Sequence, residues 1–141
     1  MRWLVIANPM AGRAQDTERL LARLRRTGGI RHEIVLTTAQ GDATRLARQA
    51  DGFDGLLVVG GDGTIAEVLH GMDFSRQRLA VLPAGHGNCL ARDLGVGHPD
   101  RALASLQRVA CRPLDLMDVS IGFADGREER RLCASTLALG Y

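Results

Sequence analysis

The sequence predicts an α/β fold: a doubly wound, mostly parallel sheet with helices on both faces, followed by the start of an incomplete all-β second domain. Short apolar or alternating runs predict the strands, at residues 3–7, 30–37, 56–59 and 79–82. Each run leads into a stretch with helical spacing of apolar residues, and this order favours parallel strands joined by right-handed crossovers. After residue 111 the spacing changes to strand-like alternation, which predicts a different architecture there.

Capping and breaking residues mark where the expected helices begin and end. Thr17 can cap the first helix, Gly28 ends it, and Asp42 can cap the second. The expected helices lie between Thr17 and Gly28, between Asp42 and Asp51, from Ile65 to Met72, up to Leu94, and from Pro99 through Leu106.

The last part of the chain reads as a β-hairpin. Residues 112–121 alternate, Asp125-Gly126 is a hairpin turn signal, and residues 131–139 fit the returning strand. A lone hairpin is marginally stable in water. We therefore expect an α/β domain over residues 1–110 and, over residues 111–141, the start of an all-β domain that this chain does not complete.

The glycine-rich turn after the third strand is the most informative stretch about function. It consists of Gly60, Gly61, Asp62, Gly63 and Thr64. Backbone N–H groups point out of the start of a helix, and the helix dipole favours negative charge there. Glycines let a ligand approach the backbone closely. A phosphate group fits this junction.

The same turn also has a purely structural interpretation. Thr64 and Glu67 have the spacing of a capping box, in which two side chains satisfy the first amides of a helix. The Asp62 carboxylate can accept hydrogen bonds from turn amides. The local sequence leaves both interpretations open.

Polar or glycine-rich turns follow the other strands as well. Asn8 follows the first strand, Thr37 closes the second, and Gly85, His86 and Asn88 follow the fourth. The carboxyl ends of parallel strands meet at one edge of a sheet, where open α/β sheets bind ligands. We therefore expect a phosphate-bearing ligand at this edge.

The basic residues exclude several classes of function. The chain of 141 residues has a formal net charge of +2, and its 18 basic side chains are all Arg and are spread along the sequence. This distribution argues against a nucleic-acid partner. Without Lys, a Walker A loop, the strand lysine of a protein kinase and Schiff-base chemistry are all excluded. Backbone amides, Arg or a metal would have to hold any phosphate.

The other titratable residues give no sign of a metal or disulfide site. The cysteines lack metal-ligand spacing and are interpreted as small buried residues: Cys89, Cys111 and Cys133. The histidines outside the turns are interpreted as surface residues: His32, His70 and His98. No signal peptide and no uncharged run of membrane-spanning length is visible, so we expect a cytoplasmic protein that at most touches a membrane.

Motifs in these turns resemble one protein family. They are Asn8-Pro9-x-x-Gly12, Thr37-x-x-x-Gly41-Asp42-Ala43, Gly60-Gly61-Asp62-Gly63-Thr64-x-x-Glu67 and Pro83-x-Gly85-x-x-Asn88. In this order and spacing they resemble the catalytic domain of the diacylglycerol kinase family, which includes YegS-like lipid kinases and sphingosine kinases. The resemblance covers nearly the whole chain. The central block is also shared by the more distant NAD kinases and phosphofructokinases.

The resemblance implies ATP in a cleft between an α/β domain and a β-sandwich domain, with transfer of the γ-phosphoryl group to the hydroxyl of a lipid at the membrane surface. Asp62 would be the catalytic residue, acting on phosphate through Mg²⁺ or orienting the reacting groups. Phosphoryl transfer depends chiefly on positioning and charge, so amides and a metal can replace the missing Lys. Arg13 is a candidate clamp. The implied nucleotide-binding residues are Asn8, Thr37, Gly60, Gly61, Asp62, Gly63, Thr64, Glu67, Gly85, His86 and Asn88.

The chain departs from the family pattern in places that bear on activity. His86 stands where the family usually has Thr, and Ala66 replaces a common Asn. The general base for the lipid hydroxyl is expected beyond Tyr141, and residues 135–141 resemble the segment that leads to it. We therefore expect the nucleotide-binding half of a lipid kinase, inactive alone.

Two alternatives remain open. One is a soluble kinase like the NAD kinases, against which the Asn8-Pro9 and Pro83-x-Gly85 turns argue. The other is a non-catalytic nucleotide-binding module, which His86 and Ala66 favour. The sequence does not predict which lipid is the acceptor or the oligomeric state.

Overall fold

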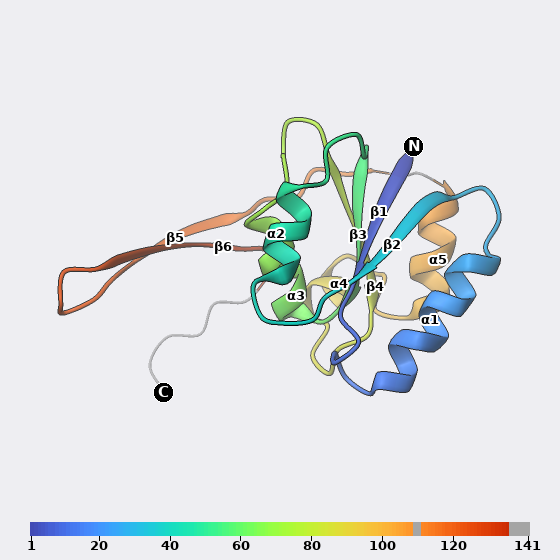
Figure 1. Cartoon of the computed structure of the whole chain (residues 1–141), viewed down its shortest axis with the longest axis horizontal. Helices are drawn as coiled ribbons and strands as arrows, with labels where there is room; N and C mark the ends of the chain where they lie inside the picture. Colours follow the sequence, from blue (N-terminus) through green and yellow to red (C-terminus); the bar gives the residue numbers. More distant parts are fainter. Residues whose placement is uncertain (109–110, 136–141) are drawn as a thin grey trace.

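The computed structural model describes residues 1–108 and 111–135, and its centre is a four-stranded parallel sheet (Figure 1). The strands lie in the order β2-β1-β3-β4, and every neighbouring pair is parallel. Their bounds are β1 (Arg2–Ala7), β2 (Arg31–Leu36), β3 (Gly55–Gly60) and β4 (Arg78–Pro83). The predicted parallel sheet is confirmed.

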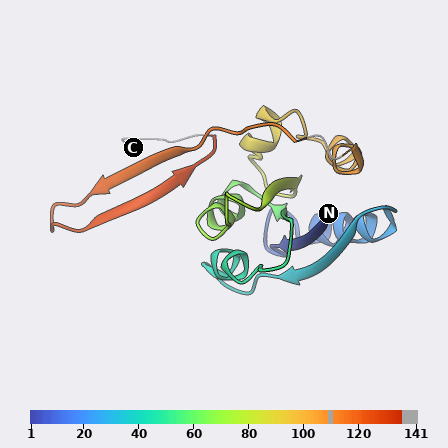
Figure 2. The same cartoon turned by 90° about the horizontal axis from the view of Figure 1, so that it is seen from above.

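Helices cover both faces of this sheet, as Figures 1 and 2 show. The helices are α1 (Ala14–Arg26), α2 (Asp42–Arg48), α3 (Asp62–Leu69), α4 (Cys89–Asp93) and α5 (Pro99–Arg108). Val5 of β1 faces the core formed with α1 and α5, whereas its neighbour Ile6 faces the core formed with α2, α3 and α4. Successive strand residues point to opposite faces, so one strand serves both cores. The doubly wound arrangement is confirmed.

The apolar runs form strands because both faces of the sheet are covered. All residues of β3 are buried, and so is most of β1. A central parallel strand with helices on each side needs apolar residues at every position, not at alternate ones. Two of the turns discussed below follow these strands.

Two predicted helix caps are wrong. Thr17 lies inside α1, where its buried hydroxyl donates to the Asn8 carbonyl (3.2 Å). Gly41, in the left-handed region at φ 87°, is the N-cap of α2, and Asp42 is the first residue of that helix. Asp42 bonds back into the preceding loop instead of capping the helix.

The end of the described chain is a two-stranded antiparallel hairpin that projects away from the α/β unit (Figures 1 and 2). It consists of β5 (Met117–Gly122) and β6 (Glu128–Cys133), with Gly126 at φ 85° in the predicted turn. The strand predicted from residue 112 begins only at Met117. The returning strand begins earlier than predicted, at Glu128, and residues 136–141 of the predicted segments lie outside the described residues. The division into domains at residues 110 and 111 stays a prediction.

Within residues 1–108 and 111–135, no helix combines the length and the apolar character that crossing a membrane requires.

Candidate functional site

The carboxyl ends of the strands open into the turns that the sequence analysis selected, all at the lower edge of the sheet in Figure 1. Backbone hydrogen bonds extend the sheet into these turns. They run from Asn8 N–H to Val59 O (2.9 Å), from Thr37 N–H to Ala7 O (2.9 Å), and from Ala84 N–H to Gly60 O (3.0 Å). The turns are therefore anchored to the sheet and to one another.

Asn8 joins the first turn to the central turn. Its side-chain Oδ1 accepts the Met10 N–H (2.9 Å), and its Nδ2 donates to Thr64 Oγ1 (3.2 Å). A side-chain amide has two N–H groups, so Asn8 keeps one donor for a further partner. The first turn is thereby held at a fixed position beside the start of α3.

Glycines bring the backbones of the first, central and third turns into contact. A Cβ added to Gly85 would lie 2.6 Å from the Gly61 Cα, and one added to Gly61 would lie 3.2 Å from the Gly85 Cα. A Cβ on Gly12 would overlap the Ala84 carbonyl oxygen, and Gly12 also has φ at 61°. Gly12 and Gly85 require glycine because another backbone occupies the space of a side chain, and a Cβ on Gly61 would be tight. Turns far apart in sequence thus meet at one point.

Asp62 links the central turn to helix α4. Its carboxylate accepts hydrogen bonds from Cys89 N–H (3.0 Å) and Leu90 N–H (3.2 Å), the first amides of α4. The structural interpretation of Asp62 as an acceptor for amides is therefore correct, and the amides come from a distant turn. A carboxylate has about four lone-pair sites, so these two bonds leave capacity for another ligand.

The third turn is shaped by Asn88. Its side chain accepts Gly85 N–H (2.9 Å) and donates to Gly85 O (2.6 Å), and its backbone is left-handed at φ 50°. Asn tolerates this region better than most residues. His86 and Gly87 at the tip are exposed. The loop presents the His86 ring to solvent beside the central turn.

The capping box predicted for Thr64 and Glu67 is not formed. Helix α3 begins at Asp62 with Gly61 as its N-cap, so Thr64 already lies in the first turn of the helix. Glu67 Oε2 instead accepts Ala43 N–H at the start of α2 (3.2 Å). Glu67 therefore ties two neighbouring helices together, and the structure does not bring its carboxylate to the Gly61–Gly85 contact.

This role of Glu67 can be tested by stability measurements. Glu67→Ala should lower the free energy of unfolding by about 1 kcal/mol because an amide at a helix start loses its acceptor. Glu67→Gln keeps an acceptor oxygen and should lie between the wild type and Glu67→Ala in denaturant unfolding. Glu18, exposed on α1, is the control site. Equal stability of the Ala and Gln variants would contradict the assignment.

Thr37 is buried at the end of β2, and the loop that follows it is fixed by Asp42. The Asp42 carboxylate accepts the Thr38 hydroxyl (2.6 Å), Thr38 N–H (2.8 Å) and Ala39 N–H (3.1 Å), and pairs with Arg45 (3.0 Å). These bonds, the Thr38 hydroxyl first among them, hold the pKa of Asp42 well below its usual range. The loop beside Thr37 is thus organised around an ionised carboxylate.

Arg13, the candidate clamp, is exposed at the start of α1, and its role stays a prediction. Two further Arg side chains lie near the turns. Arg19 and Arg23 of α1 line a cavity of about 320 Å³ beside Gly85, and Arg23 pairs with Asp100. The sequence offered no signal for Arg19 or Arg23 beyond their position on one helix.

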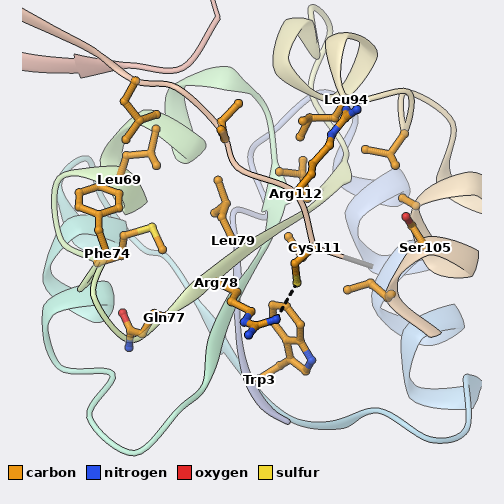
Figure 3. Close-up of a pocket in the computed structure, with 18 residues that line it drawn as sticks. Trp3, Leu69, Phe74, Gln77, Arg78, Leu79, Leu94, Ser105, Cys111 and Arg112 are labelled. Carbon is orange, nitrogen blue, oxygen red and sulfur yellow. Dashed lines mark hydrogen bonds between the residues drawn. The ribbon is translucent and has the colours of Figure 1, made fainter. Parts of the chain in front are cut away.

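A larger cavity of about 430 Å³ lies elsewhere, along the free edge of β4 (Figure 3). Trp3 and Leu79 line it together with Arg78, whose guanidinium donates to Cys111 Sγ (3.1 Å). None of the turn residues described above lines this cavity. Cys111 is exposed, so its interpretation as a small buried residue is wrong, and Cys89 and Cys133 are only half-buried.

The described residues contain no group of three or more His, Cys, Asp or Glu side chains that could hold a metal ion. Mg²⁺ commonly uses one or two carboxylates together with the phosphates of a substrate. Asp62 fits that mode of binding, because its carboxylate has lone pairs beyond the two amide bonds that it accepts.

A family model described as the diacylglycerol kinase catalytic domain matches residues 2–119. The chain is 35% identical over 124 residues to a diacylglycerol kinase of Bacillus subtilis, covering 82% of this chain and 41% of that protein. It is 32% identical over 141 residues to the human ceramide kinase, covering 83% of this chain and 26% of that protein.

A solved structure of a diacylglycerol kinase is also similar to this chain. The crystal structure of a diacylglycerol kinase from Bacillus anthracis matches with a TM-score of 0.67 and 30% sequence identity, covering 82% of this chain and 41% of that one. The chain therefore spans less than half the length of these relatives.

Proposed function

Since the chain belongs to the diacylglycerol kinase catalytic domain family, we propose that it is the nucleotide-binding part of a lipid kinase that uses ATP. The contact between Gly61 and Gly85 supports the proposal most, since it holds the third turn directly beside the start of α3. The first amides of a helix have no partner within the helix and bind phosphate oxygens readily. We propose both the identity of the nucleotide, ATP, and the class of the acceptor, a lipid.

In this proposal the chain's own residues position the triphosphate. Amides at the start of α3 and in the third turn hold the phosphates, while the remaining Nδ2–H of Asn8 and the exposed ring of His86 are further donors. Asp62 holds the third turn against the central one, and its free lone pairs would help to hold Mg²⁺ bound with the nucleotide. When bound, Mg²⁺ would neutralise charge on the phosphates.

We further propose that residues 1–110 form the nucleotide-binding domain and that residues 111–141 begin a second, β-sandwich domain. The acceptor would be a lipid hydroxyl at a membrane surface, met by peripheral contact. The general base that receives the hydroxyl proton would come from outside this chain. On this view the isolated chain binds ATP weakly and does not turn over.

The experiment that tests the function compares acceptors. The product of the complete reading frame is assayed with labelled ATP and with diacylglycerol, ceramide or sphingosine in vesicles, and separately with NAD. Transfer to a lipid and not to NAD is expected. Transfer to NAD would favour the soluble kinase, and absence of ATP binding by calorimetry at millimolar nucleotide would favour a non-catalytic module. Steady lipid phosphorylation by the isolated chain would contradict the proposal that the general base comes from outside it.

A further inference from the structure

His70 connects the hairpin to the helix that begins in the central turn. It lies at the C-terminal end of α3 and is half-buried, not a surface residue as the sequence suggested. Its Nδ1 lies 2.6 Å from the Ala66 carbonyl oxygen, one turn earlier on α3. Its Nε2 lies 3.1 Å from the backbone nitrogen of Leu132 in β6. The ring therefore bridges two elements that are 62 residues apart.

The two partners of the ring determine its protonation state. A backbone carbonyl can only accept, so Nδ1 must carry the proton that bonds to Ala66. A backbone amide can only donate, so Nε2 must be bare to accept from Leu132. Only the neutral Nδ1–H tautomer satisfies both bonds. A protonated ring would turn an N–H toward the N–H of Leu132, and the bond to the hairpin would be lost.

Apolar packing also ties the hairpin to the α/β unit in the part of the chain described. The ion pairs that the structure describes on the hairpin lie within it and join Asp118 to Arg130, Asp125 to Arg127 and Glu129 to Arg131. Leu132 and Ala134 pack, partly buried, against the core that α2 and α3 share, together with Leu116 just before the hairpin. Most of β5 and half of β6 are exposed. The bond from the Leu132 N–H to His70 Nε2 therefore adds a directed polar contact to this apolar packing.

None of the contacts described for the charged side chains on the elements packed against α3 involves the His70 ring. On α2, Asp42 pairs with Arg45; on α3, Asp62 and Glu67 accept amides of α4 and α2; and β3 has no titratable side chain. The further titratable or charged groups on α2, on β6 and next to the end of α3 are Arg48, Glu128, Glu129, Arg130, Arg131, Cys133 and Asp73. Among the contacts described for His70, the partners of its ring are the Ala66 carbonyl and the Leu132 amide.

We propose that His70 is a positioning residue that acts as a proton-sensitive latch. In its neutral Nδ1–H form it holds β6 against the C-terminal end of α3, and protonation releases the hairpin. The same helix starts at Asp62 in the central turn, so the latch sets the place of the hairpin relative to that turn. The proposal depends on the geometry of His70 and not on nucleotide binding, so each can fail without the other.

The test is nuclear magnetic resonance of the chain labelled with ¹⁵N. Near neutral pH, the His70 ring should show a protonated Nδ1 and a bare Nε2. Lowering the pH from about 8 to about 5, the range over which His ordinarily titrates, should reduce the hydrogen-exchange protection of the Leu132 amide about tenfold after correction for intrinsic exchange.

Two variants and a matched control complete the test. His70→Gln presents a carbonyl oxygen that accepts at any pH, so the protection of Leu132 should become insensitive to pH. His70→Phe fills the space without an acceptor and should lower the protection at both pH values. His32→Gln is the control, because His32 is also half-buried and bonds to a backbone carbonyl (2.8 Å), and it should leave the response intact. An Nε2–H tautomer in the wild type, or an unchanged pH response in His70→Gln, would overturn the proposal.

Discussion

Gly12→Ala should lower the free energy of unfolding by about 3 kcal/mol and separate the first turn from the third. Part of the cost, about 1–2 kcal/mol, comes from placing a Cβ on a backbone with φ at 61°. The rest, about 1–3 kcal/mol, comes from overlap with the Ala84 carbonyl, which belongs to backbone and must shift. Because the turns meet through these contacts, ATP affinity should fall together with stability. Denaturant unfolding and calorimetry measure the two effects.

A matched glycine separates local strain from a general loss of flexibility. Gly28 follows α1, its φ is not positive, and a Cβ placed there would meet nothing within 4 Å. Gly28→Ala should therefore leave stability unchanged or raise it slightly. If Gly12→Ala were as stable as Gly28→Ala, the close packing of the first and third turns would be refuted.

Asp62→Ala should destabilise the chain by about 2 kcal/mol, because the amides of Cys89 and Leu90 lose their shared acceptor at the start of α4. Hydrogen exchange should show the loss first in α4 and the third turn, while the sheet stays protected. Asp62→Asn keeps one acceptor oxygen without the charge and should cost about half as much.

The control for Asp62 is Asp93, an exposed carboxylate at the other end of α4. Asp93→Ala should change stability by no more than about 0.5 kcal/mol. If Asp62→Ala reduced nucleotide affinity without any loss of protection in α4, the structural role assigned to Asp62 would be wrong, and a role confined to the ligand would replace it.

The sequence was most informative where the signal is local. The apolar runs in β1 and β3 predict strands because a parallel strand that is covered on both faces has apolar residues at every position. Parallel pairing predicts that the turns after those strands share an edge, and the hydrogen bond from Asn8 to Thr64 agrees with it. The short helix ending near Leu94 follows from its apolar spacing in the same way.

The sequence did not predict the hydrogen bonds of side chains whose partners lie far away in the chain. Thr64 and Glu67 match a capping box by spacing, but Glu67 bonds to the start of α2 instead. The sequence analysis named no partner for His70, and its acceptor role appears only once β6 lies beside α3. Pairings of this kind depend on which elements pack together, and periodicity does not contain that information.

A titration of the ¹⁵N-labelled chain with ATP and Mg²⁺ tests the central claim, that separate turns together hold one triphosphate. Amide shifts should concentrate in residues 8–12, 60–64 and 85–88, saturate together at one nucleotide concentration, and fade in Gly12→Ala while persisting in Gly28→Ala. Shifts confined to the cavity along β4, or no shifts in a folded chain at millimolar ATP, would contradict it.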